Sequence, residues 1–387
     1  MSSAMSTRPG ILDIADKIEA GQRIDAGEAL RLLEHPNLPE LGYLADIARR
    51  RHVAGNIVTY VGGRNVNYTN VCYVDCKFCA FYRHGDAADA YVQSHDAILE
   101  RVREMVDAGG TELLMQGGLH PDLKIDWFEA LFAQIRGAFP QVHIHSLTST
   151  EVRYIAKRSK ISLRECLERL IAAGLNSLPG GGAEMLPDRV RHLLAPLKET
   201  GQEWIECHEL AHELGIQSSA TMMYGHVETL AERIEHLQML RDLQDRSGGI
   251  RAFICWSFQG PGPDLDVPPT TGFDYLRTAS VGRIFLDNVP HHQASWVTQG
   301  PKIAQVALRH GIDDMGSTMM EENVVSAAGT TFRLDAPEIE RLIREIGYMP
   351  AQRDTNYRLL TAPGEEGPSL RAARAGALRD LKIVPAS

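Results

Sequence analysis

The 387-residue sequence has few of the features that place a protein in a membrane or on a nucleic acid. It contains no apolar run near the roughly eighteen residues that cross a bilayer, and residues 1–10 have no apolar segment of a secretory signal. Lysine and arginine are scattered and the formal net charge is −10, which does not indicate a basic nucleic-acid-binding surface. We therefore expect a cytoplasmic protein that binds neither membrane nor nucleic acid.

Cysteine is also scarce, and its placement is uneven. Six cysteines in so long a chain argue against a disulfide framework, and three of them bunch at Cys72, Cys76 and Cys79. The spacing is C-x3-C-x2-C, with the aromatic Phe78 before the last, and a loop this short can turn three thiolates toward one point. Zinc normally takes a second pair of Cys or His ligands, whereas an iron–sulfur cluster takes cysteine thiolates, commonly four. A cluster held by three leaves one iron open to a small molecule; a partial zinc site or chance clustering is the alternative.

The apolar pattern after residue 55 predicts short strands that alternate with helices. Such alternation is typical of a parallel sheet, and roughly eight strands favour a closed (β/α)8 barrel of the TIM type, with an open doubly wound sheet as the alternative. We expect an N-terminal helical extension at 1–54, the barrel at 55–362 and a partly helical C-terminal tail at 363–387. The strands are expected at 56–61, 111–116, 143–147, near 177, 217–223, 250–257 and near 288–295.

Polar and glycine-rich clusters follow three of these predicted strands. In a parallel barrel the chemistry lies at the C-terminal ends of the strands, so these clusters are candidates for ligand contact. They are Gln116-Gly117-Gly118, the segment 179–184 and the segment 221–228. Paired glycines let the backbone come close to a ligand, although a plain turn also uses them. On the third strand His143 and His145 alternate, so only one of them can face the interior, and we favour His145.

A competing motif is the full H-E-x-x-H of His208, Glu209 and His212 on a predicted helix. Two histidines four positions apart share a helix face and could bind zinc, as in metalloproteases. Gly215 fits the extended form of that motif, but Ser218 stands where its third histidine belongs. The helix also lies between two predicted strands and so belongs to the outer ring. We therefore predict that this motif is structural, and that Gly215 serves as a helix C-cap.

The cysteine loop NYTNVCYVDCKFCAFYR (67–83) resembles the signature of radical S-adenosylmethionine (SAM) enzymes. Over roughly residues 25–357 the chain resembles one family of that superfamily, the cyclic dehypoxanthine futalosine synthases. The segment QASWVTQG (293–300) favours this family over the aminofutalosine synthases and the deazaflavin-forming synthases. The chain departs from the expected pattern at Ser149-Thr150-Glu151, in place of Ser-Pro-Pro-Glu, and at Cys255, in place of Pro. The other matching segments are MQGGLHPDLKIDWFE (115–129), SLPGGGAE (177–184), ATMMYGHVET (220–229), EENVVSAAGTT (321–331) and PAQRDT (350–355).

The resemblance implies two cofactors. One is a [4Fe–4S] cluster on Cys72, Cys76 and Cys79, and the other is SAM, which chelates the open iron. An external one-electron reductant such as flavodoxin or ferredoxin would act as a partner. The residues that the resemblance places at the cofactors are Phe78, Gln116, Gly117, Gly118, Glu184, Tyr224 and Glu228.

The implied reaction converts dehypoxanthine futalosine to its cyclic product on the futalosine route to menaquinone. A 5′-deoxyadenosyl radical removes the C4′ hydrogen of the substrate ribose, and the carbon radical attacks the benzoate ring before losing an electron and a proton. A base for that proton and a cation for the benzoate are also expected. Rival interpretations are an aminofutalosine synthase, an electron carrier whose cluster has lost one ligand, and a zinc metalloprotease. The catalytic candidates are His145, His226, His291, Arg277 and Arg353.

Overall fold

The computed structural model describes residues 10–260 and 265–376. Of the C-terminal tail expected at 363–387, the described part ends at residue 376 and contains α14 (Pro368–Arg374); the rest lies outside the described residues. No helix in the described ranges is long and apolar enough to cross a membrane.

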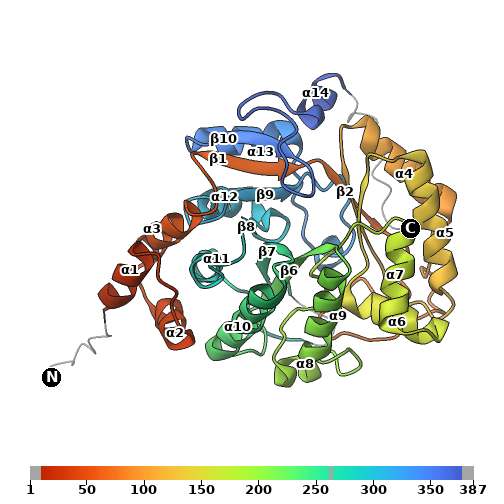
Figure 1. Ribbon diagram of the computed structural model, residues 1–387, viewed down its shortest axis with the longest axis horizontal. Helices are drawn as coiled ribbons and strands as arrows, with labels where there is room; N and C mark the ends of the chain where they lie inside the picture. Colours follow the sequence, from red (N-terminus) through yellow and green to blue (C-terminus); the bar gives the residue numbers. More distant parts are fainter. Residues whose placement is uncertain (1–9, 261–264, 377–387) are drawn as a thin grey trace.

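Ten parallel strands form one sheet in the order β10-β1-β9-β8-β7-β6-β5-β4-β3-β2, with helices around it (Figure 1). The strands are β1 (Ile57–Val61), β2 (Gly63–Asn67), β3 (Glu112–Gln116), β4 (His143–Ser146), β5 (Ser177–Leu178), β6 (Gln217–Tyr224), β7 (Ile250–Ser257), β8 (His291–Gln293), β9 (Asp314–Ser317) and β10 (Met349–Arg353). The helices are α1 (Leu12–Glu19), α2 (Ala26–Glu34), α3 (Leu38–Arg49), α4 (His95–Asp107), α5 (Ile125–Ala138), α6 (Ser149–Ser159), α7 (Leu163–Ala173), α8 (Asp188–Leu194), α9 (Gly201–Glu213), α10 (Leu230–Ser247), α11 (Gly272–Phe285), α12 (Trp296–Ala307), α13 (Ala336–Glu345) and α14, with a 3-10 turn, η1 (Ser326–Ala328).

The sheet closes on itself through β1 and β2, which Gly62 alone separates. β1 pairs with β10 and β9, whereas β2 pairs with β3. Counted as one strand, β1 and β2 therefore join the two ends of the sheet into an eight-stranded barrel, and β10 is an added strand. A Cβ on Gly62 would lie 2.2 Å from Ser369 Oγ, so this junction has room only for glycine. The TIM-type barrel predicted from the sequence is confirmed.

The N-terminal helices α1 to α3 form a layer against the outside of the barrel, beside α10 and α11 (Figure 1). Ile14, Leu32 and Leu41 are fully buried in the same apolar cluster as the residues of α10 and α11. Burying a side chain of this size stabilises the fold by roughly 1.5–3 kcal/mol. An Asp25–Glu28 capping box starts α2 and directs its apolar face toward the barrel.

The H-E-x-x-H motif lies on α9, in the outer ring of helices. His208 is fully buried and stacks on Trp204, with ring centroids 3.7 Å apart, while the His212 Nε2 bonds to Ser218 Oγ at 2.8 Å. Burial lowers the pKa of both histidines, that of His212 to about 4, so both rings are neutral. No three His, Cys, Asp or Glu side chains in the described ranges are grouped so as to hold a metal ion. The stacking of buried His208 on Trp204 and the hydrogen bond of His212 to Ser218 therefore support a structural role for this motif.

A Glu209→Gln variant tests the structural role of the motif. Glu209 forms an ion pair with Arg246 at 2.7 Å on a partly exposed helix face. Such pairs contribute roughly 0.2–1 kcal/mol, so the free energy of unfolding should fall by no more than that and turnover should be unchanged. Chemical denaturation and a turnover assay on the same preparation measure both. A collapse of activity with the fold intact would restore the motif as a catalytic site.

Candidate active site

A cavity of about 450 Å³ extends from the C-terminal ends of the strands into the barrel. The cysteine loop between β2 and α4 contributes Cys72, Cys76 and Cys79 to its lining, and the ends of β3, β6 and β7 contribute Gln116, Met223 and Trp256. The inner end of the cavity is lined from the N-terminal halves of β3, β6 and β7. We define this inner end by Glu112, Ser219 and Arg251, together with His145 of β4.

The cysteine loop is held by backbone hydrogen bonds within itself and to the end of α8. The Cys72 N–H donates to the Arg83 carbonyl at 3.0 Å, and the Lys77 N–H donates to the Leu194 carbonyl at 3.0 Å. Burial raises the pKa of the Cys76 thiol to about 12 and also raises that of Cys79. Thiolates in this position therefore need a bound cation to offset the loss of water.

The three thiols of the cysteine loop all line one cavity, although they are not grouped closely enough to hold a single metal ion. In an iron–sulfur cluster each thiolate binds a different iron, so the sulfur atoms need not converge on one point. No fourth cysteine lines the cavity among the described residues, because Cys166, Cys207 and Cys255 are buried elsewhere.

Gly118 lies directly against the cysteine loop. Its N–H donates to the Thr69 carbonyl at 2.9 Å. A Cβ at this position would lie 2.1 Å from the Val71 carbonyl oxygen and 3.0 Å from Cys72 Cβ. The glycine is thus required by the close approach of the β3 loop to the cysteine loop, whatever ligand the cavity holds.

Glu151 connects three segments beneath the cysteine loop. Its Oε1 accepts hydrogen bonds from the Tyr68 hydroxyl at 2.7 Å and the Gly117 N–H at 2.9 Å, and its Oε2 accepts one from the Thr148 N–H at 2.7 Å. The adjacent departure from the family pattern has a local reason. Thr150 donates its hydroxyl to Glu199 Oε1 at 2.9 Å, a bond that proline cannot make.

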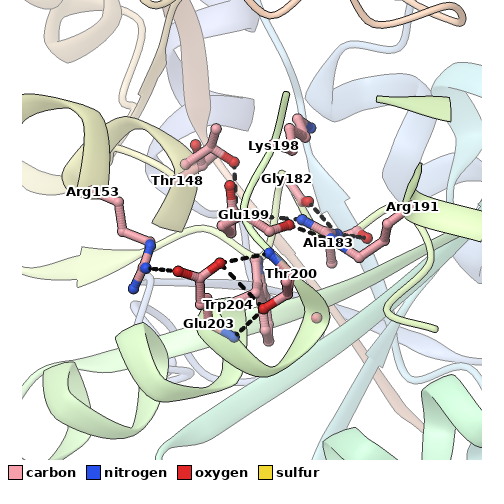
Figure 2. Close-up of polar contacts among 12 residues, drawn as sticks. Thr148, Arg153, Gly182, Ala183, Arg191, Lys198, Glu199, Thr200, Glu203 and Trp204 are labelled. Atoms are coloured by element: carbon pink, nitrogen blue, oxygen red, sulfur yellow. Dashed lines mark hydrogen bonds and ion pairs between the residues drawn. The ribbon is translucent and has the colours of Figure 1, made fainter. Parts of the chain in front are cut away.

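Arg191 of α8 holds the glycine loop 180–184 by hydrogen bonds to its backbone (Figure 2). Arg191 Nη1 donates to the carbonyls of Gly182 and Ala183 at 3.0 and 2.7 Å. Glu184, which the sequence analysis placed at the cofactor, lines the cavity and accepts a hydrogen bond from Lys198 Nζ at 2.9 Å. Burial opposes the charge of Lys198, but Glu184 raises its pKa, so the ion pair persists at the mouth of the cavity.

The lysine of that pair also stands over the ring of Phe78, 5.5 Å from its centroid. Phe78, Gln116, Gly117 and Gly118 all line the cavity, as do Glu184 and Lys198. The structure thus brings these cofactor-site candidates together with the cysteine loop.

Two further candidates do not reach the cavity. Tyr224 is fully buried in the core outside the barrel, 4.3 Å below the guanidinium of Arg233. Glu228 accepts hydrogen bonds from the Gly225 and His226 N–H groups, at 2.7 and 2.9 Å. Burial raises the pKa of Glu228, but the neighbouring His226 and Arg233 lower it to about 2. These residues hold the turn after β6, and Met223 is the residue there that faces the cavity.

Three of the catalytic candidates also lie outside the cavity lining. His226 Nε2 bonds to the Met223 carbonyl at 2.9 Å, and His291 pairs with Asp313 at 2.7 Å. Arg277 lies on α11, with its guanidinium 5.6 Å from the ring centroid of Phe273. The contacts that the structure gives these three residues are with other protein groups and not with the cavity.

His145 and Arg353 do line the cavity, but both already have hydrogen-bond partners within the protein. Arg353 makes a two-point ion pair with Asp314, at 2.5 and 2.9 Å. His145 Nδ1 accepts from Arg251 Nη2 at 3.0 Å, and burial holds the pKa of this imidazole well below its usual value. Because guanidinium can only donate, the neutral ring carries its hydrogen on Nε2.

Sequence reasoning missed Arg251, and a β-bulge is the reason. Ser218 pairs with Ile250 but Ser219 pairs with Ala252, so β7 has one extra residue, Arg251, at this point. A bulge re-aims a side chain, and here it turns the arginine into the barrel. Neither the apolar alternation of β7 nor any sequence motif predicts such an inserted residue.

Comparison with known proteins agrees with this geometry. The chain matches the Radical SAM superfamily over residues 66–240 and the CofH/MqnC C-terminal region over residues 247–366. The cyclic dehypoxanthine futalosine synthase of Streptomyces coelicolor is 48% identical over 360 residues, which cover 92% of this chain and 90% of that protein. The aminodeoxyfutalosine synthase of Thermus thermophilus is 38% identical over 358 residues, covering 90% and 96%.

The X-ray structure of the FeFe-hydrogenase maturase HydG from Carboxydothermus hydrogenoformans shares the fold, with a TM-score of 0.70 at 17% identity, over 90% of this chain and 80% of that one. The barrel and the family matches together define a radical SAM enzyme. Membership of this superfamily implies a [4Fe–4S] cluster and SAM. Within it, the chain belongs to the family of cyclic dehypoxanthine futalosine synthases.

A Gly118→Ala variant tests the contact between the β3 loop and the cysteine loop. The added Cβ must displace the Val71 carbonyl, so the loop shifts and both iron content and SAM cleavage should fall, cleavage by about tenfold, the equivalent of roughly 1.4 kcal/mol. Iron analysis and product quantification measure these. Gly137→Ala on α5 is the control, because a Cβ there meets nothing within 4 Å. Full iron content in Gly118→Ala would mean that the two loops are not mechanically linked.

Proposed function

We propose that this chain converts dehypoxanthine futalosine to cyclic dehypoxanthine futalosine, with a [4Fe–4S] cluster bound by Cys72, Cys76 and Cys79 and with SAM. The observation that carries the proposal is 48% identity over 92% of the chain to a cyclic dehypoxanthine futalosine synthase. The cavity beneath the three-cysteine loop supports it. An external one-electron reductant and a small-molecule substrate are part of the same proposal.

When bound, the cluster and SAM supply the radical that removes a hydrogen atom from the substrate. The chain has to position the substrate and keep water away from it. The outer part of the cavity is suited to both tasks, because Phe81, Leu119, Trp256 and Phe258 give it an apolar lining. The Lys198–Glu184 pair and Gln116 supply polar groups beside the cysteine loop.

The geometry narrows the search for the proton acceptor. His145 is not free to act, because its unprotonated Nδ1 already accepts from Arg251 and Ser177. Of the acidic residues in the cavity lining, Glu151, Glu184 and Glu322 are each occupied by hydrogen bonds within the protein. Glu112 is the described lining carboxylate for which the structure gives no hydrogen bond or ion pair, and we assign it the proton.

The reaction is tested directly by mass spectrometry. Reduced enzyme incubated anaerobically with SAM and dehypoxanthine futalosine should yield free 5′-deoxyadenosine and a product two hydrogens lighter than the substrate. An adenosyl adduct formed from an enolpyruvyl benzoate substrate would instead identify an aminofutalosine synthase. Absence of any SAM cleavage by cluster-loaded protein would overturn the enzymatic proposal in favour of an electron carrier.

The cluster ligands are tested by substitution. Changing Cys72, Cys76 or Cys79 to Ala should remove SAM cleavage, and the triple variant should bind no cluster iron after anaerobic reconstitution. Iron and sulfide analysis and the visible absorption spectrum report cluster loading. Cys166→Ser is the matched control, because this buried thiol lies outside the cavity and should leave the cluster intact. Cleavage retained by the triple variant would refute the assignment.

A further inference from the structure

We propose that Arg251 binds the carboxylate of an aromatic carboxylate ligand at the inner end of the cavity. The inference deepens the proposed function and rests on it for the identity of the ligand. It is carried by the position, hydrogen bonding and charge of Arg251.

The side chain of Arg251 is held in place by only part of its hydrogen-bonding capacity. The residue is 6% exposed and lines the cavity. Its Nη2 donates to His145 Nδ1 and to Ser177 Oγ, both at 3.0 Å. Its Nη1 is buried and has no hydrogen-bond partner. The guanidinium therefore keeps unused hydrogen-bonding capacity beside the cavity, which a bound acceptor can take up.

Charge distinguishes Arg251 from the other cations of the cavity. Arg353 is paired with Asp314 and Lys198 with Glu184, both within 3.0 Å. Of the basic residues that the structure describes in the lining, Arg251 alone has no acidic partner within 4.0 Å. Burial lowers its pKa to about 10, so it stays cationic at neutral pH. A buried, unpaired charge is costly, and a bound carboxylate offsets that cost through charge-assisted hydrogen bonds.

The surroundings of Arg251 specify the rest of the ligand. Leu114 and Ile254 line the cavity on the same strands as Glu112 and Arg251, further toward the mouth, and Trp256 follows Ile254. A carboxylate on Arg251 therefore places its attached group between apolar walls, as an aromatic ring requires. Glu112, to which the proposed function assigns the proton, lines the same inner end, and its charge favours the charged form of Arg251. A benzoate meets both demands, a carboxylate for Arg251 and an aromatic ring for the apolar walls.

The test measures kcat/KM for the carboxylate substrate and for its methyl ester, in wild type, Arg251→Met and Arg251→Lys. Wild type should prefer the free carboxylate over its methyl ester by about a hundredfold in kcat/KM, as expected for hydrogen bonds to a charged group. Arg251→Met should bring that ratio close to one, mainly through KM, while iron content stays at the wild-type level. Arg251→Lys should retain part of the preference, because it keeps a positive charge at this position. If Arg251→Met does not fold, Arg251→Lys serves as the variant on which the inference is tested.

Arg241→Met is the matched control. Arg241 is likewise buried, but it bonds to the Ile24 carbonyl at 2.9 Å, stacks on Phe285 and lies outside the cavity. Its substitution should lower stability without changing the carboxylate-to-ester ratio. A full preference retained in folded Arg251→Met, or an equal loss in Arg241→Met, would overturn the inference.

Carboxylate binding by Arg251 can also be tested without the proposed reaction. If wild type does not convert dehypoxanthine futalosine, benzoate itself serves as the probe in an equilibrium titration. Binding to wild type that Arg251→Met loses supports the carboxylate site independently of the reaction. Equal binding, or none to wild type, refutes it.

Discussion

The cysteine loop depends on one buried carboxylate. Glu151 caps the first turn of α6 and, from there, accepts hydrogen bonds from Tyr68 at the start of the loop and from Gly117 at the end of β3. Burial raises its pKa, and these hydrogen bonds act against that shift. Without the carboxylate, a buried hydroxyl and a buried N–H would lose their partner, at roughly 1–3 kcal/mol each. The cysteine loop is thus tied to α6, a helix two strand–helix units further along the chain.

Most of the barrel could be predicted because its strands carry their own signals. β3, β6 and β7 each contain an apolar segment, at 113–115, 222–224 and 252–256, which a glycine or polar cluster follows. β2 was missed because Gly62 and Gly63 look like the end of a strand, whereas they are a close-packed junction within one. β9 and β10 were missed because Asp314 and Arg353 are buried as an ion pair, so these strands lack the apolar pattern.

The residues of the candidate site likewise fall into those that a local sequence pattern predicts and those that it does not. The cysteine spacing and the glycine clusters are local patterns, and the structure places them around one cavity. Tyr224 and His226 were chosen from a motif, although the alternation of a strand puts Thr221 and Met223, and not Tyr224, inside the barrel. Arg251 could not be found in this way, because a bulge is a property of the pairing between two strands and not of either sequence.

The closure of the barrel at Gly62 has a consequence for how the protein is made. β1 is near the start of the chain, but its partners β9 and β10 come near the end, and Ser369 reaches back to the Gly109 carbonyl, 260 positions earlier. During synthesis the first strand therefore stays unpaired on both sides until almost the whole chain has emerged. Contacts so distant in sequence form slowly, and an open strand edge invites pairing with other chains. We therefore expect β1 to be the strand most open to pairing with other chains until β9 and β10 have been made.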